Sequence, residues 1–332
     1  MGQATDTINR TPISRGAVAR ARLASLAQRQ GALVALVLVC IFATMRYEAF
    51  LTPENLLNVV RQNSMLGLVA LGMTFVILTG GIDLSVGSLL AVAGVLAANL
   101  AGRGSALAIA AAVGFTALLG LVNGLVIAKA RIQPFIVTLA MMIAARGLAL
   151  ASTGEQSVRV DRLSEGFTWL GRGWIGPLPV PVVILAIAYA IGWVVLNHTR
   201  FGRHVYALGD NEEAARLMGL NVDRVTVGVY ALSGAMAGLA GVILASRLGA
   251  GQPVAGTGWE LDAIAAVVVG GTLLTGGQGN VTSTLVGVLL LGVIFNLFNL
   301  EGTISSWWQW VLRGFFLLVV VLIQNRLSQQ RK

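Results

Sequence analysis

The 332-residue sequence is 56% hydrophobic and only 11% charged, and its mean hydropathy is +0.80. A soluble domain usually carries about 25% charged residues. This chain therefore has too few charges to cover a water-facing surface, and a water-soluble fold is excluded. The net charge of +9 does not indicate nucleic-acid binding, because only two of the 23 basic residues are lysine and no basic cluster is interleaved with aromatic residues.

Apolar runs of spanning length recur along the chain. A transmembrane helix needs about 20 mostly apolar residues, and ten runs are candidates: 31–46, 64–79, 85–101, 105–128, 133–151, 180–197, 225–246, 263–277, 283–299 and 307–323. Two of them are short, so we allow an earlier start for 64–79 and a broken or re-entrant helix for 263–277. The sequence predicts an all-α integral membrane protein with about ten transmembrane helices.

The distribution of basic residues predicts the orientation, because loops rich in Arg and Lys stay on the cytoplasmic side. With a cytoplasmic N-terminus and ten crossings, 14 of the 23 basic residues lie inside, in the segments 1–30, 129–132, 198–224 and 324–332. We therefore expect an Arg-rich cytoplasmic segment 1–30, a transmembrane domain 31–323 and a cytoplasmic tail 324–332.

The longest outer loop, 152–179, contains Trp169 and Trp174 together with two prolines. This composition suits an interfacial lid and an aromatic belt at the membrane surface equally well.

The inner loop 198–224 contains a segment with helical signals. It comprises Gly209, Asp210, Asn211, Glu212, Glu213, Ala214, Ala215, Arg216, Leu217, Met218 and Gly219. Asp210 and Glu213 resemble a capping box, Ala214, Leu217 and Met218 share one helical face, and Gly219 suits a C-terminal cap. A helix of about two turns is too short to stand alone in water. Its apolar face therefore either docks on another protein or lies on the membrane helices or lipid.

Glycine makes up 41 of the 332 residues. The pairs Gly120/Gly124 and Gly234/Gly238 fit small-residue faces on which membrane helices approach closely. The tetrapeptide Leu-Thr-Gly-Gly occurs twice, at 78–81 and at 274–277, and is a short local repeat between the two halves of the chain.

Polar groups inside the apolar runs are the candidates for a solute path. They are Asn63, Asp83, Ser85, Asn123, Thr138 and Asn296. A carboxylate at the depth of Asp83 is a functional candidate, but at a turn it also suits a cap for the helix that follows, and the cap is favoured. The hydroxyl and amide groups suit a neutral hydrogen-bonding solute, but for any single one a hydrogen bond between helices is the favoured role.

Several enzyme classes lack their residues here. No lysine follows the glycine clusters as a nucleotide-binding P-loop requires, and the two histidines are not part of an H-E-x-x-H motif. Cys40 is the single cysteine, so no intrachain disulfide or cysteine metal site is expected. We predict no enzymatic activity, no metal and no cofactor. Ion-coupled transport of a neutral solute stays open, with Asp83, Glu260 and Asp262 as its candidate residues.

Four segments together resemble the permeases of bacterial ABC monosaccharide importers. They are 80–88, 133–147, 198–221 and 252–271, and the resemblance extends over about residues 31–325. The segment 252–271 is similar to ribose permeases in particular.

The resemblance implies a permease in the bacterial inner membrane with both termini in the cytoplasm. It would move a monosaccharide, with ribose as the first candidate sugar, from periplasm to cytoplasm by alternating access. It implies three partners: a cytoplasmic ABC ATPase that supplies ATP hydrolysis, a periplasmic sugar-binding protein, and a second permease copy, identical or related. The segment Asp210–Gly219 would be the coupling helix that docks on the ATPase. The outer segments 152–179 and 252–262 would receive the binding protein.

Overall fold

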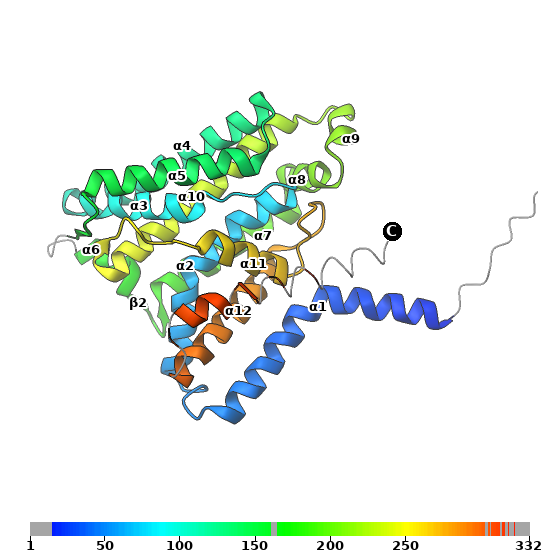
Figure 1. The fold of residues 1–332 in the computed structure, drawn as a ribbon, viewed down its shortest axis with the longest axis horizontal. Helices are drawn as coiled ribbons and strands as arrows, with labels where there is room; N and C mark the ends of the chain where they lie inside the picture. The colour runs from blue at the N-terminus through cyan, green and yellow to red at the C-terminus, as the bar shows by residue number, and fades with distance from the viewer. Residues whose placement is uncertain are drawn as a thin grey trace, which may run out of the picture.

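The computed structural model describes residues 15–160 and 165–302, and beyond them residues 305, 307–312, 314, 315, 318 and 322. Part of the predicted span 307–323 and all of the predicted tail 324–332 lie outside the described residues, and so does the beginning of the Arg-rich segment. In the part that is described, the fold is a bundle of helices (Figure 1) with two very short antiparallel strand pairs.

Seven helices of the described part are long and apolar enough to cross a membrane. They are α2 (Pro53–Leu78), α3 (Val86–Leu100) continued by the 3-10 turn η1 (Ala101–Arg103), α4 (Ser105–Ala130), α5 (Pro134–Thr153), α7 (Val180–His198), α10 (Val222–Leu248) and α12 (Val281–Glu301). Helix α2 begins eleven residues before the predicted run, because Thr52 caps it and Pro53 occupies its first turn.

The predicted count of about ten transmembrane helices is not confirmed. The run 31–46 forms the apolar part of α1 (Arg15–Arg46) and is short for a span. The run 263–277 is broken: α11 (Trp259–Val269) ends before Gly270, where a side chain would meet the backbone of Ser283. Its 11 residues rise about 16 Å, roughly half of the hydrocarbon core.

The bundle has two ends that differ in structure. At the hairpin end, β1 (Val158–Arg159) pairs with β4 (Ala250–Gly251), and β2 (Trp174–Ile175) pairs with β3 (Leu178–Pro179). Helix α6 (Glu165–Arg172) lies there as well. At the opposite α9 end lie α8 (Arg200–Asp210) and α9 (Glu212–Leu217) (Figure 1).

Helix α6 is fixed at the hairpin end by the side chain of one buried serine. The Ser246 hydroxyl on α10 accepts the Gly171 N–H at 2.7 Å and donates to the Phe167 carbonyl at 2.6 Å. The predicted outer loop 152–179 is therefore held against α10, and Trp169 and Trp174 in it are each about half exposed.

Helix α10 is the centre of the bundle and packs on α2, α3 and α4. Its contact with α4 runs through the predicted glycine pairs. A Cβ on Gly120 would lie 3.2 Å from the Gly234 Cα and would clash with the Tyr230 carbonyl, and a Cβ on Gly234 would clash with the Thr116 carbonyl. The two backbones are thus in direct contact, as small residues permit in membranes.

The outer helices carry apolar side chains on their exposed surface. In α4 and α5 about one fifth of the apolar window is buried, against about three quarters in α2 and α3. Leu118, Phe135 and Ile143 are among the exposed large hydrophobic residues. A surface of this kind suits lipid as the surrounding solvent.

The glycine contact predicts a stability difference within one helix. Gly120→Ala forces a methyl group into the α10 backbone and is expected to lower the free energy of unfolding by about 1–3 kcal/mol. Gly114→Ala, on the same helix with open space around it, is expected to leave stability unchanged or slightly higher, because alanine favours the helix. Unfolding by sodium dodecyl sulfate titration in mixed micelles measures both; equal losses for the two variants would contradict the packing argument.

Candidate functional site

The structure places the predicted site residues in three separate regions. The segment Gly209–Gly219 lies on the surface at the α9 end. Asp83, Ser85, Asn123 and Thr138 meet in a buried polar cluster, and Asn63 and Asn296 line a cavity between α2, α11 and α12. The six predicted path residues therefore do not form one path.

The helix in the surface segment is shorter than predicted, and a different residue caps it. Asp210 is the last residue of α8, and the Asn211 side chain is the cap of α9, accepting the Ala214 N–H at 2.9 Å. The predicted capping box of Asp210 and Glu213 is therefore wrong, because the chain turns at Asn211. Gly219 has a φ of +81° and ends the turn after α9, as a helix C-terminus favours.

Helix α9 presents two large apolar side chains to solvent. Leu217 is 85% exposed and Met218 is 77% exposed, whereas Ala215 on the opposite side is fully buried against the protein. The same short segment carries the Arg216–Glu212 ion pair at 2.9 Å. The apolar face thus does not fold back on the helices of the described chain.

Helix α8 connects this surface to the membrane helices. Sequence reasoning missed it, although its amphipathic spacing of Phe201, Val205 and Leu208 was a usable signal. The Tyr206 hydroxyl on α8 donates to the Gly279 carbonyl at 2.8 Å. Burial raises the pKa of Tyr206, so the hydroxyl keeps the proton that it donates.

The two Leu-Thr-Gly-Gly turns lie side by side beneath the C-terminal end of α8. The Gly277 N–H donates to the Leu78 carbonyl at 3.0 Å. Any side chain at Gly209, the penultimate residue of α8, would clash with that same carbonyl. The end of α2, the turn before α12 and the end of α8 therefore meet backbone to backbone.

The buried polar cluster is centred on the Asp83 carboxylate, which is 0% exposed. One of its oxygens accepts the backbone N–H of Ser85 at 3.0 Å and the Ser85 hydroxyl at 2.6 Å. The other accepts the Ser233 hydroxyl of α10 at 2.8 Å. Asp83 thus combines a local bond at the start of α3 with a bond to a distant helix.

Two more helices join the same cluster. The Asn123 side chain of α4 donates to the Ser85 hydroxyl at 3.1 Å, and the Thr138 hydroxyl of α5 contacts the Ile82 carbonyl at 3.2 Å. Tyr230 of α10 approaches the Ile82 carbonyl as well, at 3.4 Å. These hydrogen bonds tie the α2–α3 turn to α4, α5 and α10. The buried Asn123 Oδ1 has no hydrogen-bond partner among the described residues. Sequence reasoning missed Ser233 and Tyr230, for which a single chain carries no signal.

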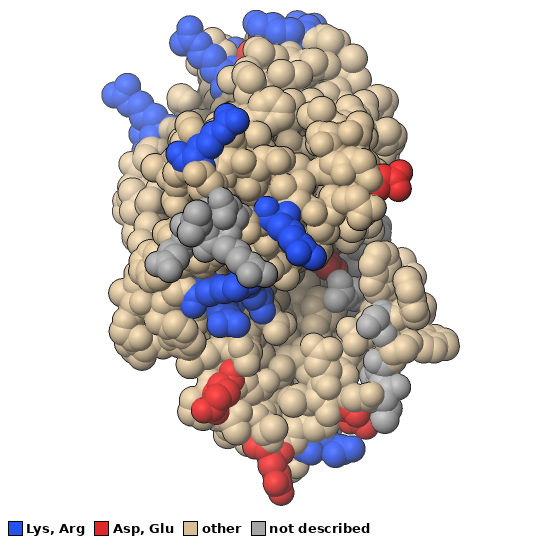
Figure 2. Space-filling view, turned by 90° about the vertical axis from the view of Figure 1, so that its left-hand side faces the viewer, with Lys and Arg blue, Asp and Glu red and all other residues tan. Residues whose placement is uncertain are grey.

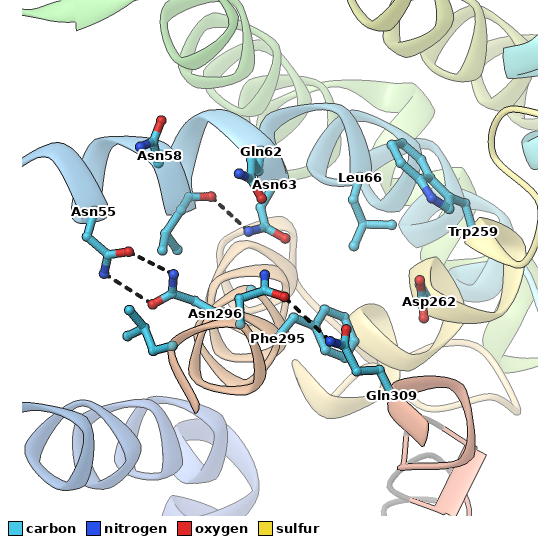
Figure 3. A pocket seen from close by; sticks show the side chains of 14 residues that line it. Asn55, Asn58, Gln62, Asn63, Leu66, Trp259, Asp262, Phe295, Asn296 and Gln309 are labelled. Carbon is cyan, nitrogen blue, oxygen red and sulfur yellow. Dashed lines mark hydrogen bonds between the residues drawn. The ribbon is translucent and has the colours of Figure 1, made fainter. Parts of the chain in front are cut away.

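The cavity has a volume of about 380 Å³ and lies in the half of the molecule near the hairpin end. Its lining is unusually rich in amides (Figure 3): Asn55, Asn58, Gln62, Asn63, Asn296, Asn299 and Gln309, with Trp259, Asp262 and Phe295 among the other residues. A volume of this size lies within the range of about 300–1,000 Å³ for small-molecule sites.

Some amides of the cavity bond to each other. Asn55 and Asn296 exchange two hydrogen bonds, of 3.1 and 2.8 Å, between α2 and α12 (Figure 3). Asn63 donates to the Val59 carbonyl of its own helix at 2.8 Å. Sequence reasoning named Asn63 and Asn296 for a solute path and Asp262 for ion-coupled transport. The recurrence of Asn55, Asn58 and Gln62 at helical spacing was the signal that could have predicted the other amides on α2.

Figure 2 shows the molecule from the hairpin end. Basic side chains gather over the upper and middle parts of this face, acidic ones lie toward its lower end and right edge, and a hollow opens in its lower half. Asn55 in the first turn of α2 and Asn299 in the last turn of α12 place the cavity at this end of the molecule.

Comparisons with known proteins decide the family. Residues 55–321 match the family described as the permease component of branched-chain amino acid transport systems. The chain belongs to this permease family. It is 45% identical over 305 residues to the ribose import permease of Escherichia coli K12, covering 91% of this chain and 94% of the relative. It is also 45% identical over 303 residues to the Bacillus subtilis ribose import permease, with the same coverage.

Another relative is named for a different pentose. The L-arabinose transport system permease of Escherichia coli K12 is 40% identical over 305 residues, covering 91% of this chain and 92% of the relative. No solved structure matches the chain. The protein is therefore a multi-pass membrane permease, a transport component and not itself an enzyme, and its family gives no support to ion-coupled transport.

The buried cluster generates a stability prediction. Ser233→Ala removes one of the three hydrogen bonds to a fully buried carboxylate and is expected to lower the free energy of unfolding by about 1–3 kcal/mol. Ser152→Ala, which removes an exposed hydroxyl bonded only within the last turn of α5, serves as the matched control with no expected change. Detergent unfolding curves compare them, and a Ser233→Ala protein as stable as the control would show that the cluster does not hold the helices together.

Proposed function

We propose that this permease is the membrane-spanning subunit of an ATP-driven importer that moves a monosaccharide, with ribose as the expected cargo, from periplasm to cytoplasm. The observation that carries the cargo is the 45% identity to ribose import permeases along 91% of the chain. The L-arabinose relatives at 40% and 37% identity support the same class of solute and rank second.

The energy comes from a separate cytoplasmic ATPase that docks on α9. Exposed Leu217 and Met218 supply an apolar patch, and the soft methionine side chain adapts to a groove. Glu212, Glu213 and Arg216 surround this patch with charges of both signs. In the proposal the coupling segment Gly209–Gly219 thus functions as a docking element and not as a membrane-bound turn.

Docking at α9 defines the orientation. The α9 end then faces the cytoplasm, together with both termini, and the hairpin end faces the periplasm. The sugar-binding protein is received at the hairpin end, on the segments 152–179 and 252–262. A second copy of the permease, identical or related, completes the membrane part within the lipid.

The contacts beneath α9 supply a route for the motion. A displacement of α9 moves α8, and the end of α8 lies against the Leu78 carbonyl and the turn of Gly276 and Gly277. These two turns end α2 and precede α12. Since α2 and α12 line the cavity at their other ends, a tilt of one against the other changes the width of the cavity.

Docking can be tested by introducing negative charge into the apolar patch. The double variant Leu217→Asp with Met218→Asp is expected to lower co-purification of the ATPase with the tagged permease at least tenfold, because two carboxylates would have to be desolvated in the interface. Val254→Asp introduces the same charge at an exposed apolar site of the hairpin end and should leave co-purification unchanged. Equal recovery of the ATPase with the double variant would refute docking at α9.

The cargo can be tested by uptake in cells of the source organism. Deletion of the gene is expected to abolish high-affinity uptake of radiolabelled D-ribose, and the wild-type gene, but not the α9 double variant, should restore it. Parallel assays with L-arabinose, D-xylose and D-galactose identify the cargo if it is another sugar. Undiminished uptake of all four sugars in the deletion strain would contradict the proposed function.

A further inference from the structure

We propose that the amide-lined cavity between α2, α11 and α12 is a binding site for one monosaccharide inside a single permease subunit. The inference rests on the proposed function and goes beyond it, because it names the cavity that binds the sugar, the residues that contact the sugar and the end of the protein at which they lie.

The lining selects for a neutral solute with many hydroxyl groups. Seven of the 14 lining residues are Asn or Gln, and none of the 14 is Lys or Arg. Each amide offers both donors and an acceptor, which match hydroxyl groups that also donate and accept. A phosphate or carboxylate ligand favours basic side chains, and the lining has none and carries the acidic Asp262 instead.

Two aromatic rings complete the chemistry. Trp259 on α11 and Phe295 on α12 both line the cavity, and Figure 3 shows both rings among the side chains of the lining. The face of an aromatic ring carries negative partial charge. It therefore attracts the C–H groups on one face of a sugar ring, while the hydroxyls at the ring edge reach the amides.

The amides divide into those that hold the helices and those that remain available. Asn55 and Asn296 are committed to each other. Asn58 and Gln62 are exposed lining residues that make no hydrogen bond to another described residue, and they lie four residues apart on one face of α2. Both side chains can therefore bond to water or to a solute inside the cavity.

Asn63 is set in place by the opposite helix. A side chain at Gly292 of α12 would clash with the Asn63 amide, so glycine at this position makes room for it. The Asn63 amide nitrogen is bonded to the Val59 carbonyl, which leaves the side-chain oxygen as its free acceptor. Asn63 is thus a rigid acceptor in the wall of the cavity.

Site-directed labelling tests occupancy directly. The chain has one cysteine, Cys40, so Gln62→Cys in a Cys40→Ser background provides a single thiol in the cavity. A charged methanethiosulfonate reagent should modify it in the purified full-length permease with its partners. Saturating D-ribose, or the sugar identified by the uptake assays, should slow the modification severalfold, whereas glycine betaine at equal osmolarity should not.

The matched control for labelling is Arg103→Cys in the same background. Arg103 at the end of η1 is exposed. It lies outside the cavity and outside the segments 152–179 and 252–262 assigned to the binding protein, so the sugar should not change its rate of modification. Protection of Gln62→Cys alone supports the proposal. Absence of protection by every monosaccharide tested, or equal protection at both positions, overturns it.

Transport by shape-conserving variants provides the second readout. Asn63→Leu should lower sugar uptake roughly tenfold, the effect of about one lost hydrogen bond to the solute, with unchanged protein level and ATPase co-purification. Asn99→Leu removes the same bond to a carbonyl four residues earlier, on α3 and outside the cavity, and should transport normally. Uptake by Asn63→Leu at the level of the Asn99→Leu control would overturn the proposal.

The two readouts separate the inference from the proposed function. If the wild-type system transports sugar but no sugar protects Gln62→Cys, the cavity proposal fails and the importer stands. If a monosaccharide protects Gln62→Cys but cells lacking the gene take up every tested sugar normally, the cavity proposal stands and the assigned cargo transport fails.

Discussion

The direct backbone contact between α4 and α10 is the constraint on which the remaining architecture depends. Lipid tails are as apolar as leucine, so no hydrophobic force drives two helices together within a membrane, and close packing must replace it. Gly120 and Gly234 remove the side chains that would separate the two helices, and their α-carbons face each other across the contact. Only with α10 this close to α4 can Ser233 of one helix and Asn123 of the other reach into the same cluster around Asp83.

The polar residues within the bundle fall into two groups, those bonded to other helices and those that face the cavity, and their hydrogen bonds distinguish the groups. The Asp83 carboxylate is tolerable in the interior because three donors satisfy it, and removing any of them leaves a desolvated charge. The amides near the hairpin end differ, because Asn58 and Gln62 line an open volume without bonds to other described residues. The bonds to Asp83 hold helices in place, whereas the amides that face the cavity are available to the proposed ligand.

The proposed energy input and the proposed sugar site lie at opposite ends of the same two helices. Exposed Leu217 and Met218 end a segment whose base, at Gly209, touches the turns that follow α2 and precede α12. The glycine residues in these turns allow three chain segments to meet without intervening side chains. Their backbones are therefore in direct contact, and a displacement of one segment is passed on to the others. A rigid connection of this kind suits a subunit that contains no nucleotide-binding motif of its own and must receive its motion from a partner.

Composition and the spacing of apolar runs determined the membrane environment, the all-helical class and most helix positions, because burial in lipid imposes long uniform runs that a single chain displays openly. The glycine faces and the short helix after Asn211 were also predictable, because each is a local pattern of residues along the chain. The tertiary structure alone decided that α11 stops at Val269, that Asp83 is bound by Ser233 from 150 residues away, and that Asn63 and Asn296 belong to a cavity apart from Asn123 and Thr138. Those outcomes depend on which faces of distant helices meet, and a pattern along one chain carries no information about its neighbours in space.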